Sequence, residues 1–165
     1  MAKLQYFLPA LAAFCLLAAG IAAGAKDVEF HVQGRVYCDN CRAGFETNIT
    51  EYLPGATVRL ECQSFFNDTV AHLMEGVTDA DGYFRLAVPS DHEEEICYVK
   101  LIESPRADCA EVKENRERAR VLLTENSGQS NSVRYANNLG FLKEQPLPVC
   151  AELLKIYKLD DETGY

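Results

Sequence analysis

Alternation of apolar and polar residues recurs along the chain and predicts a series of β-strands. In residues 27–38, Val28, Phe30 and Val32 share one face, and polar or charged residues occupy the other. Residues 56–63 repeat this alternation after the turn signal Pro54-Gly55. A period of two is typical of a strand with one buried face. Gly34 interrupts the first pattern and predicts a bulge there.

Five further segments show strand patterns of the same kind. Two of them flank Asp79-Ala80-Asp81-Gly82, which predicts a hairpin whose glycine takes a positive φ. Short strands separated by turn signals predict an antiparallel β-sandwich or barrel. The five segments are residues 70–78, 83–88, 96–104, 118–125 and 133–144.

The C-terminal segment has a different period. Cys150, Leu153, Leu154 and Tyr157 follow the i, i+3, i+4, i+7 spacing of one helix face. This spacing predicts a short amphipathic helix, with an extended tail folded back on the sheet as the alternative.

The N-terminal residues have the layout of a secretory signal peptide. Lys3 precedes a run of 19 apolar residues that ends in small side chains, with Ala23-Gly24-Ala25 as the expected cleavage site. A membrane anchor is the alternative, but the run fades into Ala and Gly and no basic cluster follows it. We therefore expect residues 1–25 to be a signal peptide and residues 26–165 to form one secreted β domain, in the extracellular space and with no membrane insertion after cleavage.

The chain is acidic, with 25 Asp and Glu against 16 Lys and Arg and a formal net charge of −9. Phosphate backbones and anionic lipids repel such a surface, so we expect no nucleic-acid partner. A basic protein partner is compatible with this charge.

Cysteine usage places the protein in an oxidising compartment. Of the seven cysteines, Cys15 lies in the expected signal peptide, and the remaining six form an even set: Cys38, Cys41, Cys62, Cys97, Cys109 and Cys150. An even number in a secreted chain predicts three disulfides, although six cysteines allow about 15 pairings. One pair can be argued from the strand faces, because Cys62 and Cys97 both lie on apolar faces and a disulfide across the interior would join their strands.

The CxxC spacing of Cys38 and Cys41 has three interpretations. A redox-active pair should open a helix, but here the motif closes a predicted strand. A structural zinc site needs two close ligand pairs, and no second CxxC or HxxxH is present. Two independent structural disulfides, one formed by Cys38 and the other by Cys41, are therefore favoured.

Other short motifs do not complete a catalytic or metal site. The stretch His92 to Ile96 resembles the start of a zinc-protease motif but lacks the second histidine, and the Asp79–Gly82 turn lacks the later ligands of a calcium loop. No nucleophile with an adjacent base is apparent. We therefore expect no catalytic residue, metal or cofactor, and a non-enzymatic protein.

Two N-glycosylation sequons lie between predicted strands. They are Asn48-Ile49-Thr50 and Asn67-Asp68-Thr69. Glycosylation of both is chemically allowed in a secreted chain, and Asn48 is favoured over Asn67 because the middle residue of the second sequon is acidic.

The stretch "VQGRVYCDNCRAGFET" resembles the signature of the olive major pollen allergen family, G-x-V-Y-C-D-x-C-R after the first strand. The resemblance continues through "PGATVRLEC", "GVTDADGYFRL", "SPRADC", "VRYANNLGF" and "PLPVC", and is strongest to the grass pollen group. A more distant similarity to transthyretin-like modules supports the same kind of fold.

Membership in this family implies an all-β, seven-stranded antiparallel sandwich or barrel of immunoglobulin- or transthyretin-like character. It also implies the disulfides Cys38–Cys109, Cys41–Cys150 and Cys62–Cys97. By resemblance, the protein acts in pollen hydration, germination or pollen tube growth by binding an extracellular protein, such as a pollen receptor kinase, and is bound by IgE in sensitised individuals. The acidic stretch Asp91 to Glu95 is a candidate contact surface, with an ordinary solvated loop as the favoured alternative. A cell-wall component that binds polysaccharide is the alternative.

Overall fold

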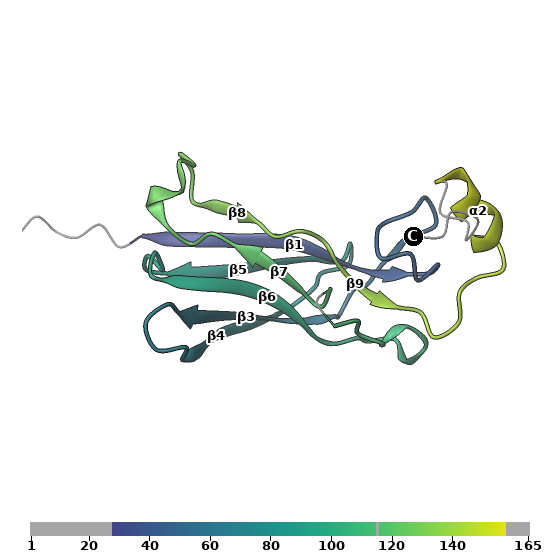
Figure 1. Cartoon of the computed structure of the whole chain (residues 1–165), viewed down its shortest axis with the longest axis horizontal. Helices are drawn as coiled ribbons and strands as arrows, with labels where there is room; N and C mark the ends of the chain where they lie inside the picture. The colour runs from purple at the N-terminus through teal and green to yellow at the C-terminus, as the bar shows by residue number, and fades with distance from the viewer. Residues whose placement is uncertain (1–27, 115, 158–165) are drawn as a thin grey trace, which may run out of the picture.

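A computed structural model describes residues 28–114 and 116–157, which form two β-sheets packed face to face (Figure 1). This region holds nine strands and one α-helix, α2, at Cys150–Ile156. The expected signal peptide lies outside the described residues. The strands are β1 (Glu29–Asp39), β2 (Glu51–Tyr52), β3 (Thr57–Ser64), β4 (Val70–Val77), β5 (Tyr83–Pro89), β6 (Glu95–Glu103), β7 (Arg118–Val121), β8 (Val133–Tyr135) and β9 (Leu139–Leu142).

The long strand β1 is the centre of the five-stranded sheet. It pairs antiparallel with β5 over residues 29–35 and with β2 at residues 37–38. On its other edge it pairs with β8 over residues 31–33 and with β9 over residues 36–39, both in parallel. The sheet is therefore mixed, and the purely antiparallel expectation is corrected at these two strands.

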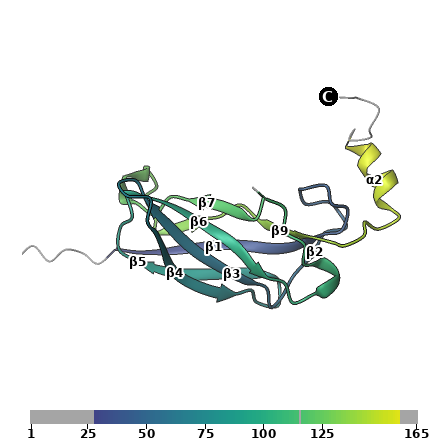
Figure 2. The same ribbon diagram turned by 60° about the horizontal axis from the view of Figure 1, so that its bottom comes forward.

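The second sheet has four antiparallel strands in the order β4-β3-β6-β7. Figure 2 shows the two sheets as stacked layers, and the core lies between them. Alternate residues of each strand face inward, as the sequence pattern predicts; on β1, Phe30 and Val32 are buried, and on β3, Val58 and Leu60. The β-sandwich expected from the sequence is confirmed.

The strand count differs from the expected seven for two local reasons. The predicted segment 133–144 is interrupted at residues 136–138 and forms two strands, β8 and β9. The two-residue strand β2 is too short to produce a periodic signal, and its pairing with Tyr37 and Cys38 depends on the tertiary fold.

The sequence predicts a hairpin at the turn Asp79–Gly82, but the two strands that flank this turn lie in different sheets. The strand before it, β4, pairs with β3, whereas the strand after it, β5, pairs with β1 in the other sheet. The turn therefore crosses between the layers. Gly82 has the expected positive φ, 75°, and its amide donates to the carbonyl of Asp79 at 3.1 Å.

Gly34 does not form a bulge. It stays in regular register opposite Phe84, whereas the irregularities occur in β3, at residues 57–58 and 60–61. A Cβ at position 34 would lie 2.6 Å from the Phe84 ring. The glycine is thus explained by the close approach of an aromatic ring and not by backbone conformation.

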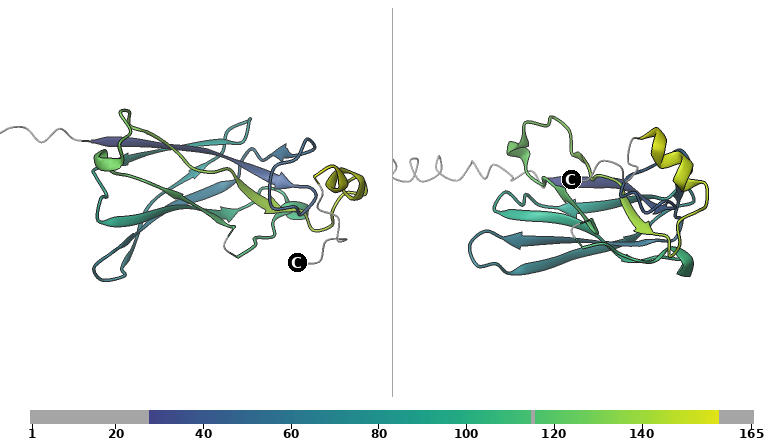
Figure 3. Two further views of the ribbon diagram at one scale, coloured as in Figure 1. Left: turned by 45° about the horizontal axis from the view of Figure 1, so that its top comes forward. Right: turned by 45° about the vertical axis from the view of Figure 1, so that its right-hand side comes forward.

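The predicted C-terminal helix is present as α2. Cys150 and Leu153 are buried, and they form with Cys41 a small cluster separate from the main core. Beyond the helix, the ring of Tyr157 meets Phe45 edge to face with centroids 5.3 Å apart. Figure 3 shows α2 at one end of the sandwich, opposite the β3–β4 and β5–β6 loops.

Candidate functional site

The CxxC sequence at the end of β1 holds two separate disulfides. Cys38 bonds Cys109, and Cys41 bonds Cys150, with Cα–Cα distances of 6.0 and 5.3 Å. The first fastens the loop after β6, and the second fastens α2. A third disulfide joins Cys62 and Cys97. These are the pairs that the family resemblance implies, and none closes the CxxC on itself.

Asp39, between the two cysteines, organises the loop that follows. It is 2% exposed, and its carboxylate accepts the backbone N–H groups of Cys41, Ala43 and Gly44 at 3.2, 3.1 and 2.6 Å. A carboxylate that accepts several N–H groups fixes the path of the chain around it. The acidic residue inside the motif therefore has a structural role, which sequence reasoning did not assign.

Arg42 extends this junction to the rest of the fold. Its guanidinium forms a bidentate ion pair with the Glu111 carboxylate, with N–O distances of 2.7 and 2.6 Å. It also donates to the carbonyl of Lys143 at 2.7 Å. The hydrogen bonds to Glu111 raise the pKa of Arg42, and those from Arg42 lower the pKa of Glu111. The signature C-D-x-C-R is thus a structural junction of three chain segments.

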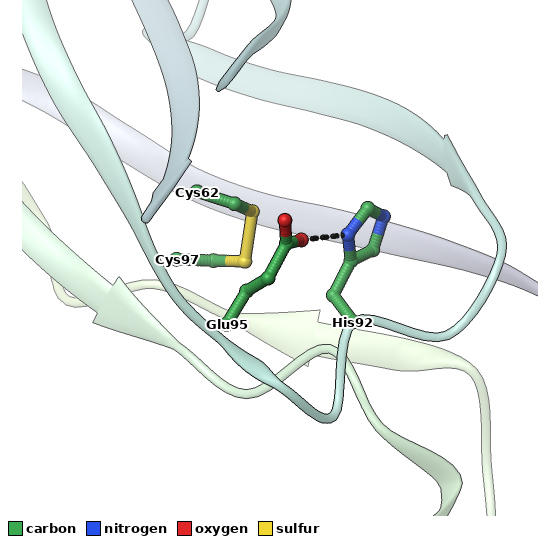
Figure 4. Close-up of side chains that lie close together, drawn as sticks. All are labelled: Cys62, His92, Glu95 and Cys97. Carbon is green, nitrogen blue, oxygen red and sulfur yellow. Dashed lines mark hydrogen bonds and ion pairs between the residues drawn. A yellow bond between two sulfur atoms is a disulfide. The ribbon is translucent and has the colours of Figure 1, made fainter. Parts of the chain in front are cut away.

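Cys62, His92, Glu95 and Cys97 form the one group in residues 28–114 and 116–157 with the donor set of a metal site (Figure 4). One ligand atom from each lies within 4.8 Å of the others. However, both sulfurs belong to the Cys62–Cys97 disulfide and are not available as thiolates. His92 and Glu95 alone supply fewer ligands than the three or four of a zinc site, so the oxidised group does not fit a zinc ion.

His92 and Glu95 shape the acidic turn between β5 and β6. Their side chains meet at 2.5 Å, between Nδ1 and Oε2, and the His92 amide donates to the carbonyl of Leu123 at 2.7 Å. Asp91, Glu93 and Glu94 are exposed. The histidine therefore holds the turn in place, and the three acidic residues beside it stay accessible to solvent.

The acidic turn is tied to the loop around the 3₁₀ turn Glu125–Ser127. The Asp91 carboxylate accepts from the Glu125 amide at 2.8 Å, and the Asn126 side-chain amide donates to Glu93 at 2.8 Å. These contacts join two loops distant in the sequence into one surface. Its exposed acidic residues are Asp91, Glu93, Glu94 and Glu125, and we call it the acidic surface below.

Buried Arg134 supports the loop that carries Glu125. Its side chain is 3% exposed and donates to the carbonyls of Leu122 and Thr124 at 2.8 and 3.0 Å. The guanidinium also lies 4.6 Å from the centre of the Phe30 ring. Sequence reasoning missed this residue, because a single arginine in a predicted strand carries no signal of burial.

The Asp79 carboxylate is engaged by its own turn. Oδ1 accepts the backbone N–H groups of Asp81 and Tyr83, both at 2.9 Å. This pattern is that of an Asx turn, which supports the interpretation of the segment as a turn and not as a calcium loop.

Both sequon asparagines lie on exposed loops. Asn48 precedes β2, and Asn67 lies in the loop between β3 and β4. Their positions are compatible with glycosylation, which stays a prediction for both.

A hollow of about 330 Å³ lies beside β7 and β9 and contains an unexpected group of cations. Lys113, Arg116 and Arg118 line it together with Asn137 and Asn138. Tyr37 also lines it, and burial together with the nearby Asp39 raises the pKa of Tyr37 to about 12. We call it the basic hollow; sequence reasoning missed it because its residues come from separate segments.

A family model described as pollen protein Ole e 1 like matches residues 28–158. The chain belongs to the Ole e 1-like family of pollen proteins. The olive allergen resemblance of the sequence analysis is thereby confirmed.

Ole e 1-like relatives match most of this chain. The pollen-specific protein C13 of Zea mays is 54% identical over 134 residues, covering 81% of this chain and 79% of that protein. The anther-specific protein LAT52 of Solanum lycopersicum is 44% identical, covering 87% of this chain and 89% of that protein. The major pollen allergen Lol p 11 of Lolium perenne is 46% identical, covering 80% and 99%.

The Ole e 1-like fold is also seen in a solved structure. The crystal structure of the major plantain pollen allergen Pla l 1 matches with a TM-score of 0.66 and 32% sequence identity, covering 73% of this chain and 98% of that chain. Among the described residues of the present protein, we find no helix with the length and hydropathy required to cross a bilayer.

Proposed function

We propose that this protein is a secreted, non-enzymatic pollen glycoprotein that acts in pollen hydration, germination or pollen tube growth by binding an extracellular receptor. Its similarity to a pollen-specific and an anther-specific protein supports the setting. Three disulfides support an oxidising, extracellular compartment. Cleavage after Ala25 would release residues 26–165 as one domain.

The acidic surface is the observation that carries the binding proposal. Its carboxylates lie on two loops that hydrogen bonds hold together, and the disulfide Cys62–Cys97 fastens β6 just after the acidic turn. Loops held in place on a rigid scaffold are common binding surfaces, because little conformational entropy is lost when they bind. The matching partner is an extracellular domain with a basic patch, such as the ectodomain of a pollen receptor kinase.

Affinity capture from pollen-tube and pistil extracts, with the correctly oxidised protein as bait, tests this proposal. The captured receptor is then used to measure association rates for the double variant Glu93→Lys/Glu94→Lys. We expect kon to fall about tenfold at low ionic strength and the difference to shrink in high salt.

The matched control changes the same charge at the opposite end of the sandwich. Glu144 and Glu152 are exposed, on the segment that leads to α2 and on α2 itself. We expect Glu144→Lys/Glu152→Lys to leave kon close to that of the wild type. Equal rates for both double variants would contradict a role of the acidic surface.

A polysaccharide-binding function is the second candidate, and the basic hollow is the observation that favours it. Three cations in one hollow suit an anionic sugar chain, because cations pair with its carboxylates. Retention on de-esterified pectin without a protein partner, lost in Arg116→Glu, would support it. Failure to bind pectin would reject the polysaccharide-binding function, and the receptor proposal would remain.

IgE binding is a separate expectation. Relatives named as pollen allergens, including Lol p 11 and Che a 1 of Chenopodium album, are 46% and 40% identical. We expect serum IgE from patients sensitised to grass pollen to bind the oxidised protein, which an immunoassay measures.

A further inference from the structure

The loop between β3 and β4 exposes an unusual amount of apolar surface. Phe65 is 55% exposed and Phe66 is 76% exposed, and Val70 at the start of β4 is 58% exposed. Single exposed apolar residues are common, but three within six residues form a patch that a partner or a modification usually covers. The Asn67 sequon lies inside this patch.

Hydrogen bonds fix the conformation of this loop. The Ser64 amide donates to the carbonyl of Thr69 at 3.0 Å, so the two ends of the loop are neighbours. The Phe66 amide donates to the Ser64 hydroxyl at 3.2 Å. Asp68 takes a positive φ of 54°, which turns the chain back toward β3. The backbone on both sides of Asn67 is therefore held in one conformation.

The side chain of Asn67 is hydrogen-bonded to Thr69, the third residue of its own sequon. Its Oδ1 accepts from both the amide and the hydroxyl of Thr69, at 3.1 and 2.6 Å. Within residues 28–114 and 116–157, the amide nitrogen Nδ2 donates no hydrogen bond. This nitrogen is the atom that N-glycosylation modifies.

We propose that Asn67 carries an N-glycan whose first sugar packs on the Phe65 ring. In the transfer, Nδ2 bonds the anomeric carbon of a lipid-linked oligosaccharide and releases one proton to solvent. The bond between that carbon and the diphosphate oxygen breaks, and the lipid diphosphate leaves with the electron pair. This inference rests on the proposed secretion, because the transfer takes place in the secretory pathway. It assigns a glycan to the sequon that the sequence analysis favours less for glycosylation, where Asn48 is preferred.

The chemistry of the two surfaces supports the contact. One face of an N-acetylglucosamine ring presents C–H groups, and the face of an aromatic ring is apolar with partial negative charge. Stacking them removes apolar surface from water. The glycan is tethered two residues from Phe65, so little additional entropy is lost when the two surfaces meet.

The glycan would also stand beside the acidic turn. The Phe65 amide donates to the carbonyl of Glu94 at 3.1 Å, so the β3–β4 loop and the acidic turn contact each other directly. A sugar that orders Phe65 would therefore stabilise the acidic surface from one side.

Glycopeptide mass spectrometry of protein secreted by plant cells is the first test. Occupancy at Asn67 is the expected result. An occupied Asn48 with an empty Asn67 would overturn this inference and leave the proposed secreted glycoprotein intact. Two empty sequons in secreted protein would overturn the glycoprotein proposal as well.

A double-mutant cycle on the secreted protein tests the packing. Glycans are trimmed to the first sugar, and Tm is measured for Phe65→Ala with and without Asn67→Gln. We expect Phe65→Ala to lower Tm by about 2–4 °C more in the glycosylated protein than in the Asn67→Gln background.

Phe66→Ala is the matched control, because it removes an equal ring from the adjacent, more exposed position. Its effect on Tm should be the same in both backgrounds. Equal effects of Phe65→Ala in both backgrounds would overturn the inference. So would dimerisation of the glycosylated wild type through this patch, seen by sedimentation and abolished by Phe65→Ala, because a second copy would then cover Phe65.

Discussion

Cys62 on β3 and Cys97 on β6 lie directly opposite each other in one antiparallel ladder, with Cα atoms 4.0 Å apart. The strand-face argument gives the right pair but the wrong geometry, since the disulfide joins neighbours of the same sheet and does not cross between the layers. Both cysteines are buried. The bond therefore fixes the register of β3 and β6 at the strand end from which the acidic turn leaves.

The disulfides should have separable effects on stability. Cys41 and Cys150 connect α2 to the sandwich through a small cluster outside the main core. We expect Cys41→Ala/Cys150→Ala to increase the rate of proteolytic release of the C-terminal segment about tenfold, with the sandwich still folded. Limited proteolysis with mass spectrometry measures this release.

The control is Cys62→Ala/Cys97→Ala, which opens a link between residues 35 apart in sequence. Here we expect a global loss of about 3–4 kcal/mol in the free energy of unfolding, measured with urea. Similar proteolytic patterns for the two double variants would contradict the separation.

Gly34→Ala tests the close approach of Phe84 to β1. The added Cβ would lie 2.6 Å from the ring and 3.3 Å from the carbonyl oxygen of Ala136. Phe84 is 2% exposed, so its ring has no room to move. We expect a loss of about 1–3 kcal/mol in a urea titration. When Phe84→Leu is added, the double variant should lose less free energy of unfolding than the two single variants lose together. Losses that simply add would argue against the ring contact.

Arg134→Lys tests the buried guanidinium. The native side chain donates to the carbonyls of Leu122 and Thr124, and a lysine ammonium has three donors in place of five. We expect the free energy of unfolding to fall by about 2–4 kcal/mol. Arg85→Lys, at an exposed position on β5, should change it by less than about 0.5 kcal/mol. Equal small effects at both positions would show that Arg134 contributes charge alone.

Glu61 should account for part of the loss of folding stability at low pH. Its carboxylate pairs with Lys100 and lies 3.6 Å from Arg59, and these cations, Lys100 first, lower the pKa of Glu61. A lowered carboxyl pKa contributes stability above the ordinary value of about 4.3, and this stability is lost as the pH falls through the lowered pKa. Glu61→Gln should therefore destabilise the protein at pH 7 and flatten the decline in stability below about pH 4.3.

Urea titrations across pH measure this dependence. Glu103→Gln, at an exposed position on β6, serves as the control and should keep the slope of the wild type. An unchanged acid slope in Glu61→Gln would contradict the assignment.

The sequence by itself determined which residues face the core and where the chain turns. Alternation placed Phe30 and Val32 inward on β1, and the i, i+3 spacing of Cys150 and Leu153 placed α2. These properties are local, because the period of the backbone decides which side of an element each side chain occupies. The signature around Cys38 and Cys41 also indicated the family.

Only the tertiary structure decided which strands pair and which side chains meet. The turn residues Asp79–Gly82 suit a hairpin and a crossing between sheets equally well. The local sequence therefore predicts a hairpin, although β4 and β5 lie in different sheets. The parallel pairing of β8 and β9 with β1, the burial of Arg134 and the basic hollow depend on residues far apart in the sequence. Periodicity reports the environment of a strand face, but pairing is decided by the packing of the two sheets on one core.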